Sequence, residues 1–197
     1  MSQMSKEDAL SLPRHRHACH VMLYADTDSK LFGRYQTKHI VLMQMRFDGL
    51  LGFPGGLVDL SKETLESGLS RELEEELGVA LLVSPEDHVS SSLAPAVPNL
   101  ITHFYAKKMN ESEIKEVEKA AVTVAKDHGL EVLGMVRVPL YFFKRGGGLP
   151  AFLSNSFIGS ARSQLLSALQ SFGLVSQQEL AKATQQANQM RHQSQPR

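Results

Sequence analysis

The chain has 197 residues, 42% of them hydrophobic and 21% charged, which is the composition of one globular domain with a sizeable core. Lysine plus arginine equals aspartate plus glutamate at 21 each, so no overall field favours nucleic acid, and polyanion binding requires locally clustered charge. The single cysteine excludes an internal disulfide framework, and without a membrane span or signal peptide we expect a soluble protein with no membrane partner.

The first part of the chain predicts strands joined by tight turns. Residues 1–15 are expected to form a flexible or helical lead-in. Alternating and β-forming residues predict strands over His17–Ala25 and His39–Arg46. Asp48-Gly49 indicates a turn, after which Leu50–Phe53 returns as the second arm of a hairpin.

Thr64–Leu77 gives the clearest helical pattern in the sequence. Leucines recur every four residues, at Leu65, Leu69, Leu73 and Leu77. Thr64 suits an N-cap and Gly78 suits a C-terminal cap. Before this helix, Pro54-Gly55-Gly56 predicts a break in regular structure.

The second part of the chain mixes strands and helices. We expect strands over Asn99–Met109 and Glu131–Pro139, a helix over Glu111–Ala125, and a long helix over Pro150–Gly173. This mixture within one domain, placed at residues 16–173, predicts an α/β sandwich with a mixed sheet. Residues 174–197 are rich in glutamine, which predicts a frayed helix or disorder.

The predicted helix at Thr64–Leu77 carries a candidate metal site. At ~100° per residue, Glu72, Glu75 and Glu76 share about one quarter of the helix surface, whereas Glu74 points to the opposite side. Neighbouring carboxylates repel, and Mg²⁺ or Mn²⁺ would relieve the repulsion through hard oxygen ligands. The alternative interpretation of Glu72–Glu76 is a charged, solvated helix face. Gly55-Gly56 favours the metal site, because a glycine backbone can approach a metal or a phosphate closely.

Arg71-Glu72-Leu73-Glu74-Glu75-Glu76-Leu77-Gly78-Val79 resembles the second half of the Nudix hydrolase box, G-x5-E-x7-R-E-U-x-E-E-x-G-U, where U is aliphatic. Glu63 stands at the family distance before Arg71. Gly56 lies one residue farther from Glu63 than the box has it, so the loop carries an insertion. The box therefore leaves open whether Glu63 pairs with Arg71.

The resemblance extends over roughly residues 16–173, to the Nudix enzymes that decap small nucleolar RNA and hydrolyse inosine diphosphate. It implies a Nudix α/β/α sandwich that uses Mg²⁺ or Mn²⁺ to hydrolyse nucleoside diphosphates and the caps of snoRNA and mRNA. It also implies a homodimer in the nucleus (nucleolus and nucleoplasm) and the cytoplasm. A sister branch lacks the glutamates and is not enzymatic, whereas all three are present here. The matching segments include 17–20, 31–34, 43–49, 51–56, 126–134, 136–141 and 156–162.

The same resemblance implies which residues surround the substrate. The nucleotide pocket would be lined by His20, Arg46, Phe53, Ser160 and Gln164. Gly55 would offer its carbonyl to the metal beside the three glutamates. Candidates for the general base are Glu75, Glu76 and Glu131, and the sequence does not decide among them. Phe53 as loop packing and His20 as an ordinary strand residue remain alternatives.

Two rival functions stay open. A Nudix hydrolase for ADP-ribose or for flavin and nicotinamide dinucleotide caps would carry the same box. A non-catalytic RNA- or protein-binding scaffold could share the fold. Basic residues at Lys107-Lys108, Lys126, Arg137 and Lys144-Arg145 are spread along the chain, which indicates solvated surface or a shared RNA-binding face. With zero net charge, we predict a shallow salt dependence of RNA binding.

Overall fold

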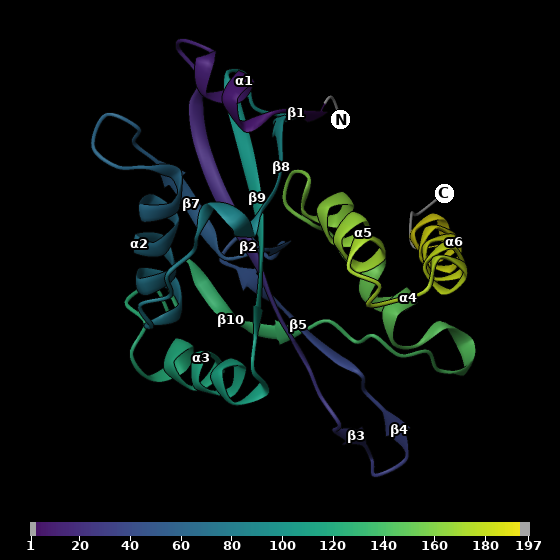
Figure 1. Cartoon of the computed structure of the whole chain (residues 1–197). Helices are drawn as coiled ribbons and strands as arrows, with labels where there is room; N and C mark the ends of the chain where they lie inside the picture. Colours follow the sequence, from purple (N-terminus) through teal and green to yellow (C-terminus); the bar gives the residue numbers. More distant parts are fainter. Residues whose placement is uncertain (1–2, 194–197) are drawn as a thin grey trace.

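Strand β2 (Arg16–Asp26) lies at the centre of the sheet in the computed structural model, which describes residues 3–193 (Figure 1). The strands follow the order β1-β8-β9-β2-β5-β10, with β6 paired to β5 and β7 paired to β2. Among the described strands, β2 and β9 run parallel and the other pairs run antiparallel. The remaining strands are β1 (Gln3–Met4), β5 (His39–Arg46), β6 (Leu51–Gly52), β7 (Gly55–Val58), β8 (His88–Leu93), β9 (Leu100–Met109) and β10 (Val132–Arg137).

One edge of β2 is shared between two partners. Its first half pairs with β7, from His17 opposite Val58 to His20 opposite Gly55, and its last residues pair with β5. The prediction of a break at Pro54-Gly55-Gly56 is therefore wrong for the two glycines. Gly55 has φ 128°, and a Cβ there would lie 2.1 Å from the Cys19 carbonyl oxygen. These glycines allow close contact between strands, which a sequence pattern cannot separate from a turn.

Helices cover both faces of the sheet. On one face lie α2 (Leu65–Leu77) and α3 (Glu111–Thr123), and on the other α4 (Leu149–Leu153), α5 (Ala161–Ser171) and α6 (Gln177–Gln193) (Figure 1). Alternation along β2 supplies both cores, because Val21 and Leu23 face α2 while Met22 and Tyr24 face α5. The structure confirms the predicted α/β/α sandwich with a mixed sheet.

Helix α2 forms as its sequence predicts. The Thr64 hydroxyl accepts a hydrogen bond from the Ser67 backbone N–H, and Gly78 ends the helix at φ 70° in the left-handed region. All four leucines of the stripe are buried against the sheet. Burial of each contributes roughly 1.5–3 kcal/mol, which fixes the face on which the glutamates of α2 lie.

The single helix predicted over Pro150–Gly173 is instead two helices, α4 and α5. The residues between them pair with β6: the Leu51 N–H donates to the Ser156 carbonyl, and the Ile158 N–H donates to the Leu51 carbonyl. Backbone groups used in that way cannot also form helical bonds. The break places the N-terminus of α5 beside β6.

The C-terminal residues also differ from the expectation of a frayed helix or disorder. Leu180, Ala183 and Ala187 of α6 are buried in the core that α4 and α5 share with the sheet. Small alanines on one stripe let α6 approach its neighbours closely, although its composition is polar. Residues 194–197 of the predicted tail lie outside the described residues, and the domain boundary at residue 173 stays a prediction.

The lead-in, expected to be flexible or helical, contains a short strand and a short helix. Helix α1 (Lys6–Ser11) is capped by Ser5, β1 pairs with β8, and Lys6 forms an ion pair with Glu66 of α2. Residues 1–2 lie outside the described residues. A hairpin of β3 (Lys30–Leu31) and β4 (Tyr35–Gln36) and two 3-10 turns, η1 (Pro85–Asp87) and η2 (Lys144–Gly146), complete the chain. No helix within residues 3–193 has the length and apolarity that a membrane crossing needs.

Candidate active site

A cavity of about 720 Å³ opens where β7 leaves the edge of β2. This volume lies within the range of small-molecule sites. The structure brings all of the predicted site residues to its wall, although their roles stay predictions. They are His20, Arg46, Phe53, Gly55, Glu72, Glu75, Glu76, Glu131, Ser160 and Gln164.

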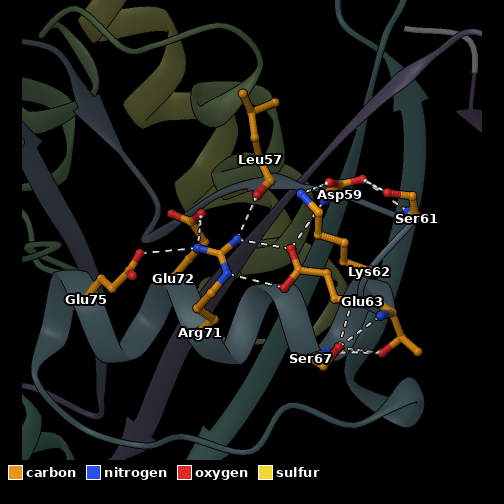
Figure 2. Close-up of polar contacts among 10 residues, drawn as sticks. Leu57, Asp59, Ser61, Lys62, Glu63, Ser67, Arg71, Glu72 and Glu75 are labelled. Carbon is orange, nitrogen blue, oxygen red and sulfur yellow. Dashed lines mark hydrogen bonds and ion pairs between the residues drawn. The ribbon is translucent and has the colours of Figure 1, made fainter.

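Arg71 connects Glu63 and the Leu57 carbonyl with two of the glutamates of the cavity, Glu72 and Glu75 (Figure 2). Its guanidinium donates to both oxygens of Glu63, at 3.2 and 3.1 Å, and to the Leu57 carbonyl at 3.1 Å. It also donates to Glu72 at 2.7 Å and to Glu75 at 3.2 Å. Glu63 thus pairs with Arg71 despite the insertion, and this hydrogen bonding is the main factor that lowers the pKa of Glu63.

Glu72 is half-buried against Gly56 of β7. A Cβ on Gly56 would lie 2.3 Å from Glu72 Oε2, so the absence of a side chain at residue 56 leaves room for this carboxylate. Burial raises the pKa of Glu72, and the negative charges of Glu75 and Glu131 add to the rise, while Arg71 opposes it. The raised pKa of Glu72 therefore results mainly from its partial removal from water.

Glu76 is the most buried of the three, with 5% of its surface exposed. The Gln44 side-chain amide donates to it at 2.8 Å and the Gly55 N–H donates at 2.7 Å. Burial raises the pKa of Glu76 to about 7, against the effect of these two donors. Gln44 was not predicted as a site residue, although a glutamine within the apolar run of β5 is a visible signal. Its Oε1 is buried without a hydrogen-bond partner among the described residues.

The predicted metal ligands do not form a metal cluster in this arrangement. Within residues 3–193, no three His, Cys, Asp or Glu side chains are placed to hold an ion together. The reason is that Arg71 binds Glu72 and Glu75, whereas Gly55 and Gln44 bind Glu76. The donor set still fits a hard divalent cation, because three carboxylates share one cavity and one of them is kept from water with a raised pKa.

The cavity is also lined by neutral polar groups. Burial, followed by the charge of Arg46, lowers the pKa of His20 to about 4, so its imidazole is neutral at pH 7. Gln164 is buried at 9% exposure, and its amide has no hydrogen-bond partner among the described residues. Ser160 is the N-cap residue of α5, but its hydroxyl does not cap the helix. These groups are available to hydrogen-bond a ligand.

Phe53 and Arg46 differ from what the resemblance implies. Phe53 is 2% exposed, and its ring centroid lies 5.0 Å from that of Phe104, so the ring packs in the core. This geometry favours loop packing over an open face for a base. The Arg46 guanidinium donates to Asp48 at 3.2 and 3.1 Å and lies over the Phe47 ring. A phosphate would therefore compete with Asp48 for Arg46.

Further residues at the cavity were missed by sequence reasoning. Arg16, Thr102 and the segment 94–97 line it from the side of β8 and β9, and Lys126 and Asp127 line it beside Glu131. Glu131 is exposed, while its backbone carbonyl accepts a hydrogen bond from the Phe47 N–H at 3.0 Å. In the sequence Lys126 is one of several scattered basic residues, since its position at the same cavity as Glu75 depends on the loop after α3.

A family profile described as "Nudt16-like: U8 snoRNA-decapping enzyme-like" matches residues 17–175. The U8 snoRNA-decapping enzyme of Mus musculus is 56% identical over 180 residues, which is 89% of this chain and 91% of the relative. The enzyme of the same name from Xenopus laevis is 50% identical over 188 residues, 92% and 88% of the two chains. The Tudor-interacting repair regulator protein of Mus musculus is 48% identical over 185 residues, 93% and 87%.

Solved structures with lower identity share the fold. The NUDIX domain of Shewanella oneidensis NrtR complexed with ADP ribose has a TM-score of 0.50 at 16% identity, over 85% of this chain and 100% of that chain. A MutT/nudix family protein from Enterococcus faecalis has a TM-score of 0.51 at 15% identity, over 84% and 70%. At these identities the likeness concerns the fold alone.

Proposed function

This chain belongs to the Nudt16-like family of Nudix hydrolases, and on that premise we propose that it hydrolyses the pyrophosphate bonds of 5′-capped RNA and of inosine-type nucleoside diphosphates. The products are a nucleoside monophosphate or an RNA with a 5′-monophosphate. The observation that carries the proposal is the cavity itself. Glu72, Glu75 and Glu76 line the same space as His20 and Gln164, so a carboxylate cluster and a set of neutral hydrogen-bonding groups face one ligand.

Nudix hydrolases generally use divalent metal ions. We propose that Glu72, Glu75, Glu76 and the Gly55 carbonyl would hold Mg²⁺ or Mn²⁺ here. When bound, such a cation polarises a phosphoryl oxygen and lowers the pKa of a water ligand. Arg71 orients two of the carboxylates through hydrogen bonds, and the Gly55 N–H orients the third. Glu75, Glu76 and Glu131 remain the candidates for the general base.

Base recognition is assigned to Gln164 and His20. The Gln164 amide lines the cavity without a partner among residues 3–193 and can donate to the six-position carbonyl of hypoxanthine or guanine, whereas adenine presents an amino group there. An unpaired buried donor costs about 1–3 kcal/mol, or roughly ten- to a hundredfold in kcat/KM. We therefore propose a preference for inosine diphosphate over adenosine diphosphate.

Replacement of Gln164 by alanine should lower the ratio of kcat/KM for inosine diphosphate to kcat/KM for adenosine diphosphate by about tenfold. The measurement is kcat/KM for both diphosphates on wild type and on Gln164→Ala. Gln170→Ala, at the other end of α5, is the matched control and should leave the ratio unchanged. Equal kcat/KM for the two diphosphates on wild type would contradict the assignment. Phe53→Ala is a poor probe, because removal of a buried aromatic ring costs about 3–5 kcal/mol of stability.

A substrate panel tests the function as a whole. Turnover of inosine diphosphate, capped RNA and ADP-ribose should be compared side by side, with Mg²⁺ and with Mn²⁺. We expect the first two to be hydrolysed faster than ADP-ribose. A clear preference for ADP-ribose would favour the rival dinucleotide hydrolase, and no turnover of any substrate would favour the non-catalytic scaffold.

The assembly and the cellular location are proposals of the same kind. We propose a homodimer located in the nucleus, including the nucleolus and nucleoplasm, and in the cytoplasm. Sedimentation equilibrium of the purified chain and imaging of a tagged chain would test them.

A further inference from the structure

A second cavity, of about 970 Å³, lies at the far end of α5 from the candidate active site. Ser160 and Gln164, at the start of α5, line the active-site cavity, whereas Gln170, near its end, lines the second one. Gln164 and Gln170 are six positions apart in α5 (Ala161–Ser171), so these edges of the two cavities are separated by about 9 Å along its axis. The β3–β4 hairpin, which projects from the end of the sheet opposite α1 (Figure 1), forms another wall.

Three aromatic side chains form a row at this second cavity. The ring centroids of Tyr35 and Phe143 lie 5.1 Å apart, and those of Phe143 and Tyr141 also lie 5.1 Å apart. The Arg34 guanidinium lies 6.0 Å from the centroid of the Tyr35 ring. Tyr35 is 43% exposed. The row contributes little to the core, and it offers ring surface to a ligand from solvent.

Five exposed cations lie on the segments that carry the aromatic row, and two of them, Arg34 and Lys38, line the cavity. Lys30, Arg34 and Lys38 come from the hairpin, and Lys144 and Arg145 directly follow Phe143. Within residues 3–193 none of these five forms an ion pair. Among the acidic residues described, Glu179 lines the cavity. We name the row and these five cations the aromatic–basic groove.

We infer that the aromatic–basic groove binds a single-stranded segment of a capped RNA whose 5′ end occupies the active-site cavity. Single-stranded RNA offers bases that stack on aromatic rings and phosphates that pair with nearby cations. The distance between the two cavities along α5 is short enough for an extended segment of single-stranded RNA to reach from one to the other. A free diphosphate is too short to reach the groove. The inference rests on the proposed function, since it concerns how the same site selects RNA over small nucleotides.

The groove also changes the expected salt dependence. Zero net charge predicts a shallow slope of log affinity against log salt, whereas phosphate contacts by all five cations would give a slope of roughly −3.5 for a single strand. The cations lie far apart in the sequence, at residues 30–38 and 144–145, so the fold alone brings them together. Positive charge for phosphate contacts can thus come from neighbouring cations on the surface, although the composition of the chain is balanced.

The test measures binding of a 5′-monophosphorylated single-stranded RNA by fluorescence anisotropy. Tyr35→Ala should raise Kd about tenfold, through the loss of one stacking ring. Lys38→Gln should weaken binding and reduce the salt slope by about 1. Lys119→Gln, which removes an exposed cation of α3, is the matched control and should change neither quantity. Turnover of inosine diphosphate should stay at the wild-type rate in all three variants, which shows that they are folded.

The outcomes separate this inference from the proposed function. RNA affinity and salt slope unchanged in both groove variants would overturn the inference, while decapping by wild type would still support the function. If wild type fails to cleave capped RNA but the groove variants lose RNA affinity, the function fails and the groove stands. Dissociation of a dimer by Tyr35→Ala without loss of RNA affinity would assign the groove to contact between two copies, and would also overturn the inference.

Discussion

Replacement of Glu76 by glutamine should lower kcat for inosine diphosphate and for capped RNA by about a thousandfold or more. The substitution removes a charge and keeps the volume, so the loss reports the carboxylate itself. A lost metal ligand costs several kcal/mol of transition-state stabilisation, and each 1.36 kcal/mol is a factor of ten. Glu74→Gln, on the exposed side of α2, is the matched control and should keep nearly the wild-type rate.

In the absence of metal, Glu76→Gln should be more stable than wild type. Burial raises the pKa of Glu76 from 4.5 to about 7, so the folded protein holds this proton more tightly than the unfolded chain. The contribution of Glu76 to the stability of wild type is then greatest below pH ~4.5 and falls as the pH rises through about 7, by roughly 3 kcal/mol. Glu76→Gln should remove most of that fall.

Gln44 strengthens the argument for stability. Its Nε2 now donates to Glu76, while its Oε1 is buried without a partner among the described residues. Once the Gln44 amide has rotated by half a turn, a glutamine at residue 76 can donate to Gln44 Oε1 and accept from the Gly55 N–H, so both contacts of residue 76 are kept while Gln44 Nε2 takes the unpartnered position. Urea denaturation with a chelator at pH 5 and pH 8 measures the effect. A variant that keeps wild-type turnover would exclude Glu76 from the metal site, and one that loses stability at pH 8 would contradict the raised pKa.

The elements that were predicted correctly from the sequence depend on local interactions. Thr64, the leucine stripe and Gly78 determine α2 among residues close in the chain, and the hairpin of β5 and β6 closes over the short connection 47–50. The candidate site residues were found through the resemblance and through their positions on α2. The structure then placed all of them at one cavity.

What could not be predicted depends on contacts between distant segments. From the sequence Gly55 is expected in a loop, and only the pairing of β7 with β2 shows that it lies in a strand. From the sequence Phe53 is a candidate for stacking on a base, and only its contact with Phe104 shows that its ring is packed in the core. Helix α6 has a polar composition, and only the surface of α4 and α5 explains why Leu180 and its alanines are buried. Glu76 is buried where α2 meets Gln44 of β5 and Gly55 of β7, 32 and 21 residues earlier in the chain, so its raised pKa has no local sequence signal.

Replacement of Gly56 by alanine should lower kcat/KM about a hundredfold while the protein stays folded. The backbone of Gly56 does not have a positive φ, so alanine is tolerated there. The added Cβ would lie 2.3 Å from Glu72 Oε2 and 2.6 Å from Glu72 Cδ, and the flexible side chain of Glu72 must therefore move. A displacement of about 1 Å in a catalytic arrangement costs around a hundredfold in rate.

A double variant shows whether the loss acts through Glu72. If it does, Gly56→Ala combined with Glu72→Gln should be no slower than Glu72→Gln alone, because the two changes remove the same interaction. Gly134→Ala, in β10, meets nothing within 4 Å and should keep the wild-type rate. Steady-state kinetics give the rates, and thermal melting of each variant shows whether it is folded. Losses that multiply in the double variant would mean that Gly56 acts independently of Glu72, for example by direct approach of its backbone to a phosphate.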